Sequence, residues 1–234
     1  MRPLKTIAAL SSLAAVLVTA TSAANAAAID VQFSRDPGHQ QTGAAVIGHA
    51  GDVWNDFLGN ASTGALLDTS GAASGVSLSF SAYGAYEADP GYTQFTGKAD
   101  ANLMQGYLYA FTDTPAIDLA FSGLTAGQEY GFWIYTQGDN NSHGRSISLT
   151  ANGGSAQVAT QSNASSFSLG DNYVYLVSTA NASGVVDIVG QDLNGEANIN
   201  GVQVMAVPEP SSVFLMMAGF TFLAGAAMRR SRAR

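Results

Sequence analysis

The chain has 234 residues with a formal charge of −8 and no cysteine, which excludes thiol chemistry and a disulfide framework. Its charge is uneven, because residues 27–206 hold three of the nine basic residues but 16 of the 17 acidic ones, a formal charge of −13. A domain with this negative charge repels the phosphate backbone of nucleic acids, and we therefore expect no nucleic acid partner.

Residues 1–26 have the pattern of a secretory signal peptide. Arg2 and Lys5 precede an apolar stretch at 7–20, and the Ala-Asn-Ala at 24–26 fits the small-x-small rule of signal peptidase. The alternative is a retained membrane anchor, but the apolar stretch is short and ends in small residues. We therefore expect cleavage by signal peptidase after this tripeptide and export of the mature chain.

Residues 27–206 form the predicted exported domain, and their pattern is that of short strands. Apolar and polar residues alternate at 29–33 and 76–83, with the period of two that places one strand face in a core. Turns rich in Gly, Asn and Ser separate the strands, which is typical of a β-sandwich. Further predicted strands are 117–121, 130–136, 145–150, 173–178, 185–189 and 198–204. Residues 98–108 are predicted to form the one helix of this domain.

Two segments resemble parts of known sandwiches. FSGLTAGQEYGFWIY, residues 121–135, resembles the GLxxGxxY corner of fibronectin-type and jelly-roll domains, which implies that the Tyr130 hydroxyl bonds back to the turn. GEANINGVQVMA, residues 195–206, resembles the closing strand of galactose-binding-like jelly rolls, which implies that the first and last strands pair. The predicted fold is all-β: a single antiparallel β-sandwich of this type, with an N-terminal signal helix and one C-terminal transmembrane helix.

The sequence contains no specific catalytic motif. None of the three histidines lies in HExxH, and no GxSxG nucleophile elbow occurs. A Ser-His-Asp triad assembled in space stays open, as do carboxylate pairs such as Asp52 with Asp56 or Glu87 with Asp89. We expect these acids to be solvated and the domain not to be an enzyme.

GHAGDVWNDFLG, residues 48–59, is the first candidate ligand site. The Trp54 ring could stack on a sugar while Asn55 hydrogen-bonds its hydroxyls. The alternative is that Trp54 is a buried plug beneath its loop, as tryptophans usually are.

The loop at 135–146 is the second candidate site. Its possible ligand-binding residues are Asp139, Asn141, His143 and Arg145. Ca²⁺ is the one cofactor left open, and its candidate ligands are Asp139, Asn141, Asp192 and Glu196. The spacing fits no EF-hand, and a hairpin tip shaped only for its turn explains the loop equally well.

The chain ends in VPEPSSVFLMMAGFTFLAGAAMRRSRAR, residues 207–234. Residues 211–228 are uncharged and mostly apolar, and 18 residues in a helix span roughly 27 Å, the lower limit for a bilayer. The basic tail at 229–234 places the chain end in the cytoplasm by the positive-inside rule, and the domain outside. Prolines keep 208–210 extended just outside the membrane.

This ending closely resembles the PEP-CTERM sorting signal of Gram-negative bacteria. The matching signal residues are Val207, Pro208, Glu209, Pro210, Arg229 and Arg230. The resemblance implies that exosortase, a transpeptidase-like membrane enzyme, processes a precursor held transiently in the inner membrane. It also implies delivery to the cell surface or the extracellular exopolysaccharide matrix.

The predicted function is that of a non-catalytic exported surface or matrix protein, sorted by exosortase and associated with exopolysaccharide and biofilm. A carbohydrate-binding module is the alternative, and an exported hydrolase is less favoured. A Trp54 side chain exposed beside a groove would favour the binding module, whereas a buried one would favour the structural role.

Overall fold

The computed structural model describes residues 28–89, 91–139 and 144–208. The predicted signal peptide, Asn141, His143 and everything from Glu209 onward, including the predicted span and basic tail, lie outside these ranges. The described residues form 14 strands and one short helix, which confirms the all-β prediction. In chain order the elements are β1 (Ile29–Ser34), β2 (Trp54–Leu58), β3 (Ala61–Leu67), β4 (Ala73–Ser81), β5 (Gly84–Glu87), α1 (Ala101–Gln105), β6 (Gly106–Ala110), β7 (Ile117–Ser122), β8 (Glu129–Tyr135), β9 (Ser146–Ala151), β10 (Gln157–Ala159), β11 (Tyr173–Thr179), β12 (Val186–Asn194), β13 (Ala197–Ile199) and β14 (Gly201–Ala206).

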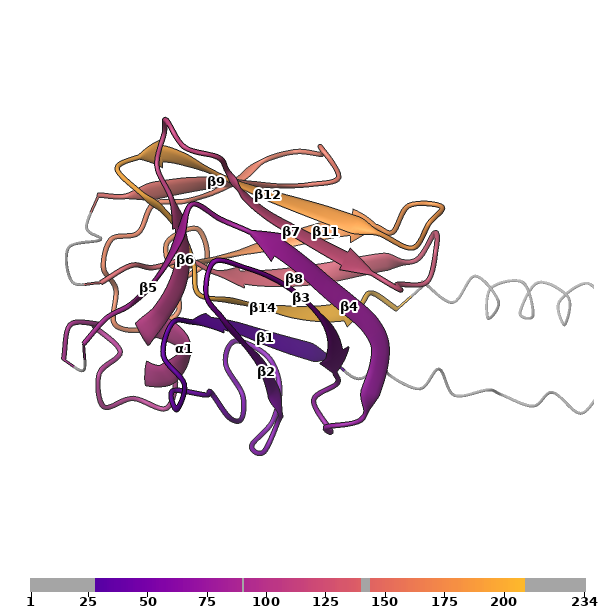
Figure 1. Ribbon diagram of the computed structural model, residues 1–234, viewed down its shortest axis with the longest axis horizontal. Coiled ribbons are helices and arrows are strands. Elements are labelled where there is room, and N and C mark those ends of the chain that lie inside the picture. The colour runs from indigo at the N-terminus through magenta and orange to yellow at the C-terminus, as the bar shows by residue number, and fades with distance from the viewer. Residues whose placement is uncertain (1–27, 90, 140–143, 209–234) are drawn as a thin grey trace, which may run out of the picture.

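Two large sheets face each other in a sandwich-like arrangement (Figure 1). The first has the order β11-β8-β14-β1-β2 and the second β10-β9-β12-β7-β4-β3, and a small sheet, β13-β6-β5, lies at one end. Inward residues of both large sheets form one core, which includes Val31, Phe33, Leu78, Phe121 and Phe132. The alternation seen in the sequence thus places one face of each strand in this core.

One strand pair departs from the antiparallel prediction. β1 and β2 are parallel, with Asp30 opposite Trp54, while the other paired strands are antiparallel. A parallel pair requires the chain to return to its starting end, and the long loop at 35–53 makes this crossover. Sequence periodicity carries no information on strand direction, so it could not have revealed this pair.

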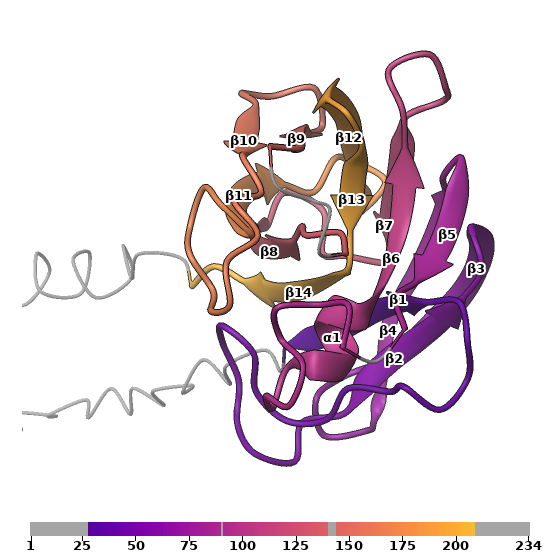
Figure 2. The same cartoon turned by 90° about the vertical axis from the view of Figure 1, so that its left-hand side faces the viewer.

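The first and last strands pair, as predicted from the closing segment. β1 and β14 are antiparallel neighbours, with Ile29 opposite Val204. The described chain therefore begins and ends at the same end of the sandwich, on the right in Figure 1. The small sheet and α1 lie at the opposite end, which Figure 2 brings into view.

The predicted tyrosine corner is confirmed. The backbone N–H of Thr125 donates a hydrogen bond to the hydroxyl oxygen of Tyr130 at 2.9 Å. Gly127 has a φ of +79°, a conformation that glycine adopts without strain. This corner fixes the turn that leads from β7 into β8.

Two element predictions need correction. The predicted helix at 98–108 is only α1, because Gly106 begins a strand in which Leu108 pairs with both β5 and β13. The predicted strand at 198–204 is divided at Asn200, whose side chain bonds the backbone of Gly106 and Gln137 instead. Tertiary pairing overrides local pattern in both segments.

The outer face of the first sheet carries a second, smaller core. The loops at 35–53, 91–100 and 162–171 cover this face together with α1. The buried residues of the second core are Trp54, Phe95, Leu103, Met104 and Tyr135. Among the described residues, no helix is long and apolar enough to cross a membrane.

Candidate functional site

Trp54 lies inside the second core and not at a binding surface. Its side chain is only 1% exposed, and its ring packs 6.4 Å, centroid to centroid, from that of Tyr135. The indole N–H donates to the carbonyl oxygen of Gly43 at 2.8 Å. The ring therefore offers no open face to a sugar, and the geometry supports the buried plug.

The amide of Asn55 is also used within the fold. Its Nδ2 donates to the carbonyl oxygens of Asp30 and Leu67 at 2.9 and 2.8 Å, and its Oδ1 accepts from the Leu67 N–H at 2.8 Å. These bonds join β1 to β3 through β2. Ligand binding by Asn55 would have to break them, so its role here is structural.

The candidate residues from two distant loops do converge, around Arg145. Its guanidinium contacts Glu196 Oε1 at 2.8 Å and Asp139 Oδ1 at 3.6 Å. Asn198 Nδ2 donates to the same Glu196 oxygen at 2.7 Å. Burial raises the pKa of Glu196 despite these two partners, and the charges of Asp139 and Asp192 act in the same direction as burial.

This cluster is an ion-pair network in which a protein cation already lies between the acids. Arg145 pairs with both Asp139 and Glu196, and Asp192 Oδ2 accepts a hydrogen bond from the Thr112 hydroxyl at 2.5 Å. Within residues 28–89, 91–139 and 144–208, no group of three or more histidine and acidic side chains is placed to hold a metal. The geometry therefore adds nothing in favour of Ca²⁺ at Asp139, Asp192 and Glu196.

An aromatic surface next to this cluster was missed at the sequence level. We name it the tyrosine face, and it consists of Tyr83, Tyr86, Tyr107, Tyr109 and Phe111. The side chains of Tyr83, Tyr86 and Phe111 are 51%, 37% and 39% exposed. The rings of Tyr83, Tyr109 and Phe111 contact one another edge to face, with centroids 5.5 to 5.8 Å apart.

The tyrosine face follows from the period of two along β6. Leu108 and Ala110 enter the main core, so Tyr107 and Tyr109 lie on the opposite side of the strand. β5 places Tyr86 opposite Tyr107, with ring centroids 5.4 Å apart. The alternation in GYLYA, residues 106–110, was the available signal, and the helix prediction over this segment concealed it.

No described serine and histidine form a nucleophile–base pair of the kind that a hydrolase needs. The Ser34 hydroxyl donates to Asp56 Oδ1 at 2.6 Å, whereas His39 Nδ1 lies 3.0 Å from Glu87 Oε1. The serine is thus bonded to an acid and the imidazole to a different one. In the first carboxylate pair noted in the sequence, Asp56 is bonded to Ser34, whereas Asp52 Oδ2 accepts from the His49 backbone N–H.

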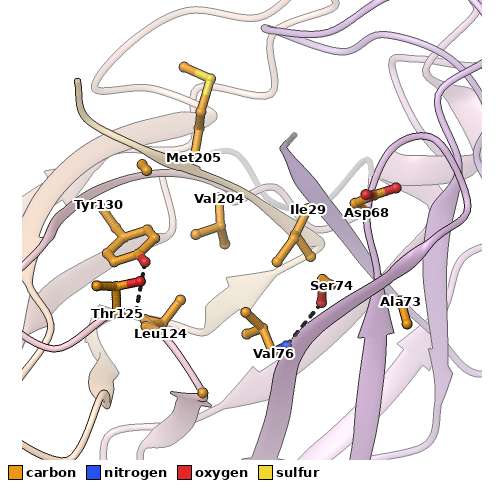
Figure 3. Close-up of a pocket in the computed structure, with 12 residues that line it drawn as sticks. Ile29, Asp68, Ala73, Ser74, Val76, Leu124, Thr125, Tyr130, Val204 and Met205 are labelled. Atoms are coloured by element: carbon orange, nitrogen blue, oxygen red, sulfur yellow. Dashed lines mark hydrogen bonds between the residues drawn. The ribbon is translucent and has the colours of Figure 1, made fainter. Parts of the chain in front are cut away.

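A cleft of about 290 Å³ opens where the described chain begins and ends (Figure 3). Its lining combines apolar side chains, among them Ile29, Val76 and Leu124, with polar groups such as Ser74. Asp68 is its one acidic side chain, and hydrogen bonds, foremost from Ser70, lower the pKa of this carboxyl. A single carboxylate held as an anion in its own turn provides no acid–base pair.

β14 is extended beyond its last paired residue by one more anchored position. The Val207 N–H donates to the Glu129 carbonyl at 2.9 Å, and the Val207 carbonyl accepts from Gln128 Nε2 at 2.7 Å. Pro208 follows, exposed, as the last described residue. Residues 206–232 match the family model of the PEP-CTERM protein-sorting motif.

The chain ends in a PEP-CTERM motif. Because the motif begins at residue 206, its first two residues still belong to the sandwich edge, and its Pro-Glu-Pro follows directly. The PEP-CTERM motif implies export and a membrane-anchored precursor that exosortase processes. The exosortase substrate site is therefore joined to a folded domain without a linker.

Two solved structures to which the sandwich is similar are distant from it. The crystal structure of a beta-glucuronidase from Bacteroides uniformis is 17% identical, with a TM-score of 0.36, over 56% of this chain and 14% of that one. An exo-beta-1,3-galactanase from Phanerochaete chrysosporium, solved with galactose, is 13% identical, with a TM-score of 0.24, over 62% and 26%. No curated protein sequence matches the chain. Likenesses this partial assign no activity to the domain upstream of the PEP-CTERM motif, and its galactose-binding-like type stays a prediction.

Proposed function

We propose that this chain is a non-catalytic exported protein that exosortase sorts to the cell surface or the extracellular matrix, where its sandwich associates with exopolysaccharide in biofilm. The observation that carries the proposal is the PEP-CTERM motif that directly follows a folded β-sandwich. A sorting signal joined to a stable domain makes that domain the delivered cargo.

The arrangement of the ends supports this role. Ile29 and Ala206 lie at the same end of the sandwich, and the tyrosine face is built on the small sheet at the other end (Figures 1 and 2). A precursor held in the membrane through its C-terminus presents the far end of the domain to its surroundings. The cargo can therefore meet matrix components before and after processing.

The non-catalytic role is supported by how the titratable side chains are used. Arg145 pairs with Asp139 and Glu196, and His39 pairs with Glu87 without reaching Ser34. Neither His39 nor Arg145 lines the cleft of Figure 3 or the cavity beside Phe111. The contacts of these two side chains stabilise loops, which is what an architectural or binding domain requires.

Replacement of the recognition residues tests the sorting step. We expect Glu209→Ala with Pro210→Ala to leave the full-length protein in the inner membrane, measured by fractionation of the producing cells and immunoblotting. The matched control removes a glutamate and a proline from the sandwich surface, Glu129→Ala with Pro115→Ala, and should be processed normally. Release of the tail variant at the wild-type level would overturn the proposal.

A further inference from the structure

We propose that the tyrosine face is a binding site for a neutral polysaccharide. The inference rests on the proposed function, because it assumes that the delivered sandwich meets a sugar polymer. The sugar polymer would contact the aromatic rings at one end of the domain. These rings also replace the loop containing Trp54 as the expected binding surface.

The rings of Tyr83, Tyr109 and Phe111 contact one another, and the exposed Tyr86 ring packs on Tyr107, which is itself buried. Tyr83, Tyr86 and Phe111 come from both sides of the β5–β6 pair, and each keeps more than a third of its side chain in solvent. Water-exposed aromatic rings that touch one another are uncommon on monomeric domains and mark interaction surfaces. Flat aromatic faces suit the apolar faces of pyranose rings, while the phenol hydroxyls can bond sugar hydroxyls.

The surface is also held in place before any ligand arrives. The Tyr109 ring lies directly on Gly84, so closely that a Cβ on that residue would be 2.3 Å from the ring Cζ. Tyr109 in turn packs against Tyr83 and Phe111. Rings that are fixed by their neighbours lose little conformational entropy on binding, which favours affinity.

A buried amide and a cavity adjoin the rings. Asn198 lies opposite Tyr109 in the sheet register and is fully buried, and its Oδ1 has no partner among the described residues. This oxygen is covered by protein, so it does not contribute to the exposed surface. A cavity of about 260 Å³, lined in part by Phe111, Thr112 and Asp192, opens at the edge of the face.

Charge selects the class of sugar polymer. Residues 27–206 carry a formal charge of −13, and Arg145, the cation nearest the face, already pairs with two acids. A polymer of uronic acids would meet repulsion at this surface, whereas a neutral polymer would not. The expected ligand is therefore a neutral polysaccharide with exposed pyranose faces.

The site is placed where a polymer can reach it. Gly106, at the start of β6, contacts the backbone at Ser34, the end of β1 that is farthest from Ile29. Figure 2 shows β13, β6 and β5 side by side at this end of the molecule. The tyrosine face is thus remote from the residues that join the sandwich to its membrane signal.

The test is affinity gel electrophoresis of the protein purified from producing cells, with dextran, laminarin or galactomannan in the gel and alginate as the acidic comparison. We expect retardation by at least one neutral polymer and none by alginate. Tyr83→Ala with Phe111→Ala should weaken that binding about tenfold, since stacking on each ring contributes the energy of a good aromatic contact. Tyr83→Phe with Phe111→Tyr keeps both rings and should bind like the wild type.

Tyr86→Ala and Tyr175→Ala form a matched pair, because both tyrosines are 37% exposed and only Tyr86 belongs to the tyrosine face. Binding should weaken for the first variant and not for the second. Equal loss in both, no retardation by any neutral polymer, or preference for alginate would overturn this proposal. Sorting is scored separately in the Glu209 and Pro210 variant, so failure of sugar binding and failure of sorting are distinct results.

Discussion

The indole N–H of Trp54 donates a hydrogen bond to the carbonyl oxygen of Gly43, 2.8 Å away. This bond joins β2 to the crossover loop that passes over it, and the ring fills the second core beside Tyr135. A residue that could be taken for a sugar platform thus holds the longest loop of the first sheet in position.

Trp54→Ala should lower the free energy of unfolding by about 3–5 kcal/mol, because it leaves a cavity in the second core. Trp54→Phe keeps an aromatic ring but leaves the Gly43 carbonyl unpaired, and should cost about 1–3 kcal/mol. Urea denaturation of the processed protein measures both changes. Full stability of the alanine variant would contradict the buried role of Trp54.

Tyr130→Phe tests the corner between β7 and β8. Loss of the hydroxyl removes the acceptor of the exposed Thr125 N–H, which water can then solvate, so we expect stability to fall by about 0.5–1.5 kcal/mol. Tyr92→Phe is the matched control, since Tyr92 is 60% exposed and its hydroxyl removal should have no effect. The same melting temperature in both variants would show that the corner bond contributes nothing.

Asp30 predicts a pH dependence of stability. This side chain is fully buried, opposite Trp54 and Gln203, and burial raises its pKa from 3.8 to about 7, with a smaller effect from the Asp52 charge. Between these two pH values the folded state binds the proton that the unfolded state has released. Stability should therefore fall as the pH rises from about 4 to about 7.

The variant Asp30→Asn removes the titrating group while it retains the side chain's shape. Its free energy of unfolding should fall less steeply than that of the wild type over this pH range, and the variant should be the more stable protein at pH 8. Urea denaturation at pH 5 and pH 8 measures the difference. Identical slopes for the two proteins would locate the pH dependence elsewhere.

The Gln128 side chain is expected to slow processing by exosortase. Its side chain holds the Val207 carbonyl against the sandwich edge, one residue before the Pro-Glu-Pro. Gln128→Ala should detach Val207 from the sandwich edge more often, by about two- to tenfold for the loss of one hydrogen bond of about 0.5–1.5 kcal/mol, and so speed exosortase processing. Pulse-chase labelling of precursor and product measures the rate, with Gln157→Ala, an exposed glutamine on β10, as the control. A slower or unchanged rate would contradict this view.

The features that the sequence predicted correctly have local signals. The alternation around Val31 and Leu78, the corner at Tyr130 and the PEP-CTERM ending each depend on neighbouring residues, so a single sequence reveals them. The pairing of β1 with β14 could be predicted because residues 195–206 resemble a known type of closing strand.

The features that were missed depend on distant partners. Leu108 is in a strand because β5 and β13 pair with β6 on either side. The sequence of residues 98–108 does not indicate that these strands will pair with it. The convergence of Asp139 and Glu196 on Arg145 likewise depends on how two loops meet in space. Which face of β6 stays open also depends on the elements packed around it, so the tyrosine face required the structure.

The position of β14 sets the order in which this protein can be completed. β14 lies between β8 and β1, in the middle of its sheet, and is the last strand before the PEP-CTERM signal. During N-terminus-first translocation, β1 and β8 emerge early but cannot be bridged until the final strand has crossed. The first sheet can therefore be completed only after β14, the strand that leads into the PEP-CTERM motif, has been exported. The strand that completes the first sheet is thus the same strand that joins the domain to its sorting motif.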